Sequence, residues 1–182
     1  MKATGIVRRI DDLGRVVIPK EIRRTMRIRE GDPLEIFTDR EGEVIFKKYS
    51  PIGELAAFAA QYAETLHKTC GMAVVIRDRD AVLACAGVSK KEYNDRKLSG
   101  EMEKIIEGRA LYTADGKEDV PVVDGGSCLV SCAMPIITEG DITGCVASVF
   151  SRAGDVDQLM NAELETKLVQ TAAGFLGRQL ES

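Results

Sequence analysis

Basic side chains are concentrated at the start of this chain, and most of them are arginines. The first 29 residues hold nine bases and three acids, a net charge of +6. The whole chain of 182 residues has a net charge of −4, so the remaining residues together carry −10. Such an asymmetry indicates a nucleic-acid surface at one end. The nine bases are Lys2, Arg8, Arg9, Arg15, Lys20, Arg23, Arg24, Arg27 and Arg29.

The chemistry that this cluster favours is phosphate binding. A guanidinium group presents a planar fork of N–H donors that fits phosphate oxygens and the edge of guanine. Seven of the nine bases are arginines. They fall near expected turns and a short helix, from which they can project. A solvated charged face is the alternative, and the residue types favour DNA or RNA binding over it.

No comparable set of residues predicts catalysis or a metal site. The cysteines at 128 and 132 have C-x3-C spacing, but zinc would need two further ligands, and the single histidine, His67, is distant in the sequence. His67 is expected at the surface. No nucleophile–base pair is recognisable, so we predict no enzyme activity and no cofactor. The cysteines expected to be small core residues are Cys85, Cys128, Cys132 and Cys145.

The overall composition suits one ordinary domain or two small ones. Hydrophobic residues make up 45% of the chain and charged residues 30%. No apolar run approaches the roughly 18–20 residues that a membrane span needs. The first residues lack the apolar core of a signal peptide. The sequence therefore predicts a cytoplasmic protein with no membrane partner.

The first 50 residues predict a β-β-α-β-β unit. Alternating apolar residues indicate strands at 4–10 and 15–18, joined by a turn at 11–14. Pro19 suits the start of a helix that ends by residue 28. Two further strands follow near 34–37 and 43–48. A unit this small buries too little apolar surface to be stable alone, so we predict that two copies share one core.

The rest of the chain predicts an antiparallel sheet flanked by helices. A helix of about 17 residues is expected from Ser50, its N-cap, and a second one from residue 155 onward. Both carry apolar stripes. These stripes either cover the chain's own sheet or form a four-helix interface between subunits. Strands are expected at 72–76, 81–86, 110–113, 128–137 and 142–150, with a hairpin turn at 77–80 and a broken helical region at 90–108.

The run from Thr4 to Arg24 closely resembles the DNA-binding head of the AbrB-type transition-state regulators, and residues 2–48 fit that family throughout. The resemblance implies a swapped-hairpin β-barrel made by two intertwined chains. It implies DNA contacts from Arg8, Arg9, Arg15, Arg23 and Arg24, with Lys2, Lys20, Arg27 and Arg29 as secondary candidates. Antitoxins share this head, but they usually continue into a short tail, whereas about 130 well-composed residues follow here.

Residues 51–182 resemble a GAF-type sensory domain, which implies oligomerisation and a pocket for an unidentified small ligand. The combination is similar to a family of sporulation regulators that activate and repress genes in the forespore. We therefore predict an α+β protein with two domains, 1–50 for DNA binding and 51–182 for sensing and oligomerisation. It would bind double-stranded promoter DNA by sequence or shape. The alternative is a small-molecule sensor whose head mainly dimerises.

Overall fold

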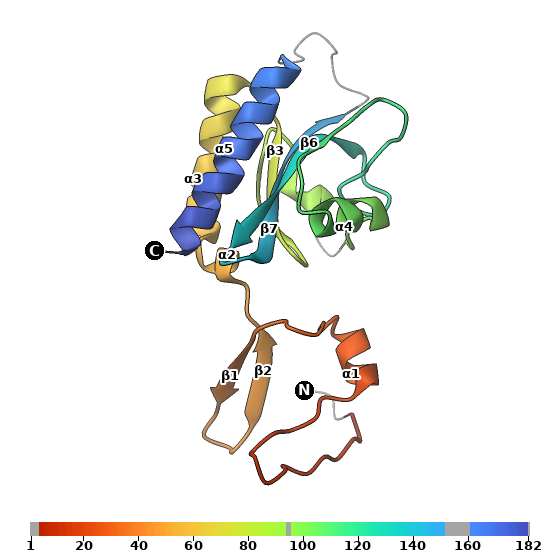
Figure 1. Ribbon diagram of the computed structural model, residues 1–182, viewed down its shortest axis with the longest axis vertical. Coiled ribbons are helices and arrows are strands. Elements are labelled where there is room, and N and C mark those ends of the chain that lie inside the picture. Colours follow the sequence, from red (N-terminus) through yellow and green to blue (C-terminus); the bar gives the residue numbers. More distant parts are fainter. Residues whose placement is uncertain (1–3, 94–95, 152–160, 182) are drawn as a thin grey trace. The chain divides into compact units, whose positions relative to one another are not determined.

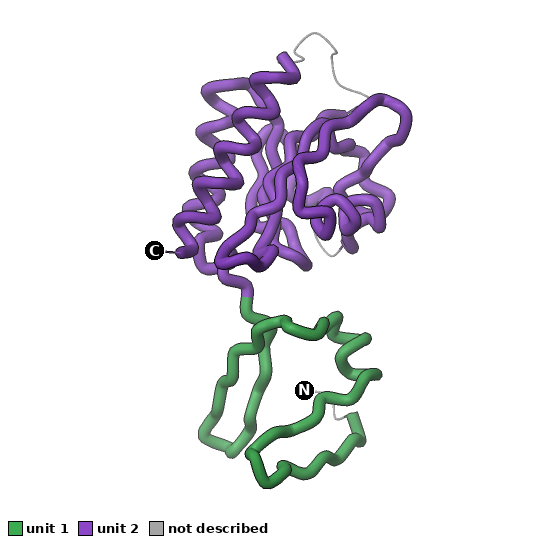
Figure 2. The backbone as a smooth tube through the Cα atoms, in the orientation of Figure 1, with its two compact units in different colours: residues 1–49 green, residues 50–182 purple. Residues whose placement is uncertain are grey.

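The computed structural model describes residues 4–93, 96–151 and 161–181. The chain divides into two compact units, residues 1–49 and 50–182 (Figure 2). The boundary lies one residue before the predicted boundary at 50. Each unit is described by itself below.

The N-terminal unit holds one helix and one antiparallel hairpin. The elements are α1 (Lys20–Thr25), β1 (Leu34–Thr38) and β2 (Val44–Lys48) (Figure 1). Ile36 lies opposite Phe46 in the hairpin. The strands predicted at 4–10 and 15–18 are wrong for the single chain. This segment makes a turn, but a strand needs a hydrogen-bonded partner, and the described part of the chain supplies none.

Residues 4–49 have almost no core of their own. Pro19 is the single buried residue among them. A hairpin whose apolar side chains face outward is at best marginally stable in water. The unit therefore lacks the burial that would hold it folded as an isolated copy. Its exposed large apolar side chains are Ile6, Val7, Ile10, Leu13, Val16, Val17, Met26, Ile36, Phe37, Val44, Phe46 and Tyr49.

The C-terminal unit is built on a five-stranded antiparallel sheet, with the strand order β4-β3-β7-β6-β5. The predicted fold class of helices with an antiparallel sheet is confirmed. β3 continues two residues further than expected, so Arg77 lies in the strand and not in the turn. The strands are β3 (Val74–Asp78), β4 (Val82–Ala86), β5 (Tyr112–Thr113), β6 (Cys128–Thr138) and β7 (Asp141–Ser151).

Helices cover both faces of this sheet (Figure 1). One face carries α3 and α5, which lie side by side, and the other carries α4. The helix expected from Ser50 is interrupted at Leu55, close to Gly53, a poor helix former. The Ser50 side chain caps the first piece by accepting a bond from the Gly53 amide at 3.1 Å. The helices are α2 (Pro51–Glu54), α3 (Ala56–Cys70), η1 (Lys90–Glu92), α4 (Gly100–Glu107) and α5 (Ala162–Leu180).

Two apolar layers enclose the sheet because successive strand residues point to opposite faces. In β3, Val74 and Ile76 pack towards α3 and α5, whereas Val75 packs towards α4. The start of the last helix, expected at residue 155, lies outside the described residues. Among these residues, no helix is long and apolar enough to cross a membrane.

Candidate DNA interface

The helix α1 presents three basic side chains on neighbouring turns. Lys20, Arg23 and Arg24 have the i, i+3, i+4 spacing that places side chains on one side of a helix. Lys20 and Arg24 are exposed, and Arg23 is half-buried. The helix is short because Met26 leaves the helical conformation and Arg27 adopts a left-handed backbone with φ of 52°. The basic side chains are thus gathered on a single helical turn and a half.

Asp11 builds the turn that presents Arg15. Its carboxylate accepts hydrogen bonds from the Leu13 amide at 3.1 Å and the Arg15 amide at 2.7 Å. The same carboxylate pairs with the Arg15 guanidinium, Nε to Oδ2, at 2.8 Å. The Arg15 amide and then its side chain lower the pKa of Asp11. Asp11 therefore stays ionised and orients Arg15, whose side chain is largely exposed.

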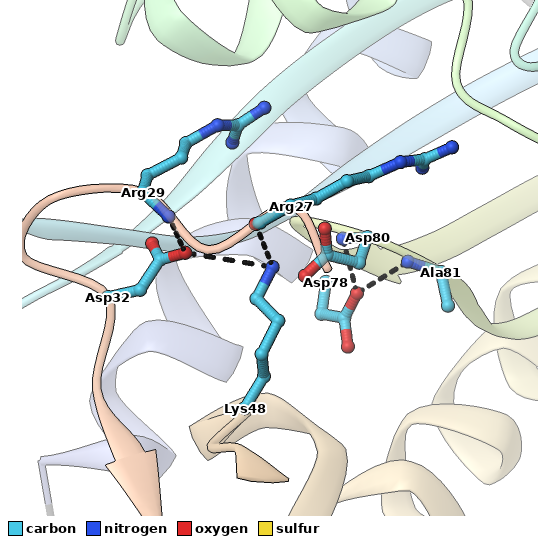
Figure 3. Close-up of polar contacts among 7 residues, drawn as sticks. All are labelled: Arg27, Arg29, Asp32, Lys48, Asp78, Asp80 and Ala81. Atoms are coloured by element: carbon cyan, nitrogen blue, oxygen red, sulfur yellow. Dashed lines mark hydrogen bonds and ion pairs between the residues drawn. The ribbon is translucent and has the colours of Figure 1, made fainter. Parts of the chain in front are cut away.

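Lys48 fastens the end of the α1 region to the hairpin (Figure 3). Its ammonium group donates to the Arg27 carbonyl at 2.8 Å and lies 3.6 Å from the Asp32 carboxylate. Asp32 in turn accepts a bond from the Arg29 amide at 2.8 Å. This network holds the backbone between Arg27 and Asp32 in place. Lys48 was not among the predicted residues, because a lysine at the end of a strand carries no signal that it will bond a distant carbonyl.

Most of the predicted arginines have no acidic partner. Within residues 4–93, 96–151 and 161–181, no carboxylate pairs with Arg8, Arg9, Arg23, Arg24 or Arg27. All of these except Arg23 are exposed, as are Lys20 and Arg29. Unpaired guanidinium groups on a surface keep their donors for an external anion. Lys2, a secondary candidate, lies outside the described residues.

The single chain unites only part of this candidate set. α1 brings Lys20, Arg23 and Arg24 together, and the Asp11 turn fixes Arg15. Arg8 and Arg9 lie on an exposed extended segment without a strand partner. Joining them into one surface requires that segment to be ordered by a further contact.

The cysteines and the single histidine lie in packed or partly packed positions. Cys128, Cys132 and Cys145 are buried, as expected, whereas Cys85 is half-buried, and all five thiols are free. His67 is half-buried and not at the surface, because its ring lies 3.1 Å from the Met72 carbonyl and against Gly87. No group of three potential metal ligands occurs in the described part of the chain.

Comparison with known proteins decides the family. Residues 54–181 match the family described as "Stage V sporulation protein T C-terminal, transcription factor". The chain is 53% identical to stage V sporulation protein T of Bacillus subtilis over 186 aligned positions, covering 100% of this chain and 99% of that protein. The chain belongs to the stage V sporulation protein T family. The predicted DNA-binding transcription regulator of sporulation is confirmed at this level.

Two further similarities concern the separate units. The first part of the chain is 63% identical over 51 residues to the transition state regulatory protein AbrB of Bacillus subtilis, covering 28% of this chain and 52% of AbrB. This similarity confirms the prediction that the chain begins with an AbrB-type head. Residues 7–53 also match the family "Antidote-toxin recognition MazE, bacterial antitoxin".

A solved structure resembles part of this chain in fold. A methyl-accepting chemotaxis protein fragment, residues 122 to 287, aligns with a TM-score of 0.50 at 16% identity. The alignment covers 69% of this chain and 88% of that fragment. At this identity the similarity concerns the fold alone.

Proposed function

We propose that this protein regulates sporulation genes as a homo-oligomer whose N-terminal units pair into a swapped-hairpin barrel. The observation that supports the pairing is that residues 4–49 have almost no buried core of their own. Twelve large apolar side chains are exposed there in the single chain. A second copy would cover them and supply strand partners for residues 4–10 and 15–18. The similarity to AbrB over this region supports the same arrangement.

We propose that double-stranded promoter DNA is held by the arginines of this barrel. Arg8, Arg9, Arg15, Arg23 and Arg24 are the principal contacts, and the secondary candidates Lys2, Lys20, Arg27 and Arg29 add charge. Support comes from the exposed unpaired guanidinium groups and from the turn that orients Arg15. Pairing two copies doubles the local charge and strengthens the attraction for a polyanion.

The C-terminal unit is proposed to join two such dimers into a tetramer. Phe58 and Tyr62 of α3 pack against Phe175 of α5, with ring centroids 5.8 and 5.7 Å from that of Phe175, and the Tyr62 ring is stacked on it. Phe175 is 40% exposed and Leu164 of the same helix is 50% exposed. An aromatic cluster across two neighbouring helices, with one exposed ring, is a typical anchor for subunit contacts.

The remaining parts of the proposal concern where and how the protein acts. As a sporulation regulator it would act in the cytoplasm, on the nucleoid of the forespore. A transcription-factor family is consistent with a protein that performs no catalysis. The C-terminal unit would sense a small ligand and pass its occupancy on to DNA binding. A sensor whose head only dimerises is the competing proposal, and DNA binding decides between them.

The test is DNA affinity measured against salt concentration by gel shift or anisotropy. Removing Arg23 and Arg24 from a dimer deletes four charges. Each lost phosphate contact reduces the slope of log affinity against log salt by about 0.9, so the slope should fall by about 3–4. The single variant Arg24→Ala shows whether a loss of binding comes from lost charge and not from misfolding, because Arg24 is exposed and its replacement should leave the fold intact. Arg40→Ala, in the turn between β1 and β2, is the matched control. An unchanged slope in the double variant refutes the proposed surface.

A further inference from the structure

A buried cation lies in the sheet of the C-terminal unit without partners for most of its donors. Arg77 of β3 is 0% exposed. Its Nε donates to the Asp78 carbonyl at 2.7 Å, but neither terminal nitrogen has a hydrogen-bond partner. Buried charges in proteins are normally paired, because an unsatisfied one carries a large desolvation cost. An arginine left in this state needs an explanation.

The surroundings of Arg77 place it in the layer beneath α4. It follows Val75, which packs in that layer, by two residues on the same face. Its register partners are Val82 on β4 and Cys145 on β7. Most members of this layer are apolar, with Met102 and Ile106 of α4 among the buried ones. The terminal nitrogens therefore point into a largely apolar space.

Nearby acids act on Arg77 only through space. Asp78 and Asp80 in the adjoining turn and Glu103 of α4 favour its charged form, as does the Cys145 thiol. None of them accepts a hydrogen bond from its terminal nitrogens. Desolvation outweighs their attraction and lowers the pKa of Arg77 to about 10. The protein therefore maintains this cation at an energetic cost that its own acids do not cancel.

A second unsatisfied donor lies in the same layer. The hydroxyl of Tyr93 is buried without a well-formed hydrogen bond, and its polar neighbour is the Cys128 thiol. Tyr93 belongs to the same buried cluster as Val75, in the layer that α4 covers. Across the described residues, the Tyr93 hydroxyl and the two Arg77 nitrogens are the buried side-chain polar atoms that lack a partner. A buried tyrosine hydroxyl usually finds one.

We propose that the layer between the sheet and α4 binds a small organic carboxylate, with its charge on Arg77 and its body against the apolar lining near Tyr93. This rests on the sensory role proposed for the C-terminal unit. Two parallel N–H donors match the two oxygens of a carboxylate. A single buried cation balances one negative charge, which favours a monocarboxylate over a phosphate. Because Arg77 has no exposed surface, this layer has to open for the ligand to enter.

The experiment is thermal unfolding of the full-length protein with sodium salts of acetate, propionate, butyrate, hexanoate and octanoate. The matched primary amides and equal sodium chloride serve as controls. A carboxylate present at about 100 times its dissociation constant should raise the melting temperature by about 5 °C or more. The amides should not, because they carry no charge for Arg77.

Three variants separate binding from structure. Arg77→Met should abolish the carboxylate response while melting at or above the wild-type temperature, because it removes an unpaired buried charge. Tyr93→Phe should weaken the response, since it removes the hydroxyl that is available to the ligand while keeping the ring. Lys68→Met, on the exposed side of α3, should leave the response unchanged.

Several results would overturn the site. These are no stabilisation by any carboxylate, equal stabilisation by the amides, an unchanged response in Arg77→Met, or an Arg77→Met protein that melts lower or does not fold. DNA affinity is measured separately by gel shift. Stabilisation that requires Arg77 but leaves DNA affinity unchanged supports the site and refutes the sensory role. Loss of DNA binding in the Arg23 and Arg24 variant bears only on the head.

Discussion

The uncovered face of the β1–β2 hairpin gives the sharpest test of pairing between N-terminal units. Ile36, Phe46 and Val44 share one face of the hairpin and are 61%, 43% and 57% exposed. In a monomer, replacing such an exposed residue should change stability by less than about 0.5 kcal/mol. If two copies share a core, the same replacement removes an apolar side chain that the second copy buries. Ile36→Ser therefore distinguishes the two arrangements.

The size of the effect follows from the exposed fraction. Complete burial of an isoleucine side chain contributes about 1.5–3 kcal/mol. Since 61% of Ile36 is still open in the single chain, pairing would bury a share worth about 1–2 kcal/mol. Each dimer contains two such positions, so Ile36→Ser should cost about 2–4 kcal/mol. Dimer affinity would fall roughly 30- to 700-fold.

Sedimentation equilibrium of a fragment of residues 1–50 measures this directly, without association through the C-terminal unit. Glu35→Ser is the matched control, because Glu35 is the adjacent residue and points to the opposite face. The control should associate as the wild type does. A wild-type fragment that is folded and monomeric, or an Ile36→Ser fragment that associates normally, would refute the shared core.

Three further perturbations test other parts of the molecule. Phe175→Ala should convert the proposed full-length tetramer to dimers in sedimentation while keeping DNA binding, and an unchanged oligomeric state would exclude the aromatic cluster as an anchor. The depression of the pKa of Arg77 from 12.5 to about 10 corresponds to roughly 3 kcal/mol, so urea unfolding should show Arg77→Met to be more stable than wild type, by up to that amount. Glu92 accepts bonds from the Ser127 and Cys128 amides, at 2.6 and 3.0 Å, so Glu92→Gln should lower stability by about 1–2 kcal/mol. Burial raises the pKa of Glu92, but hydrogen bonds from the thiol and amide of Cys128 and from the hydroxyl and amide of Ser127 together lower it. The stability that Glu92 contributes is therefore complete above pH about 4.5 and is lost as the pH falls further, which acid titration of the wild type and variant should show.

The elements with strong local patterns were predictable from the sequence. Alternating or continuous apolar runs located β3, β4, β6 and β7, and Ser50 was correctly predicted as a cap. In β6 the observed strand ends one residue beyond the predicted residue 137. These features depend on neighbouring residues, which the sequence displays directly.

Features that depend on distant contacts were not predictable. Arg77 was assigned to a turn because charged residues follow it, yet the register with Cys145 on β7 buries it. The interruption at Leu55 and the bond from Lys48 to the Arg27 carbonyl also depend on the folded geometry. The strands at 4–10 and 15–18 failed for a related reason, because their pattern anticipates partners that one chain does not contain.

The candidate DNA-binding residues were also predictable only in part. The composition pointed to the arginines, and the resemblance to the AbrB-type head separated the principal candidates from the secondary ones. In the structure the Asp11 carboxylate holds Arg15 through two contacts, one with its amide and one with its Nε. The signal available in the sequence was the Asp-x-x-Gly-Arg spacing, in which an aspartate closes a turn and reaches the next arginine.

The open hydrophobic face of residues 4–49 also affects when the protein can act. Because two copies must associate to bury the core of the head, its folding is a second-order process. While the chain is scarce, the yield of protein able to bind DNA therefore rises with the square of the chain concentration. Freshly synthesised single copies would meanwhile display an unprotected backbone to proteases. Scarce protein would thus be cleared while abundant protein persists, which sharpens the onset of regulation without any additional regulator.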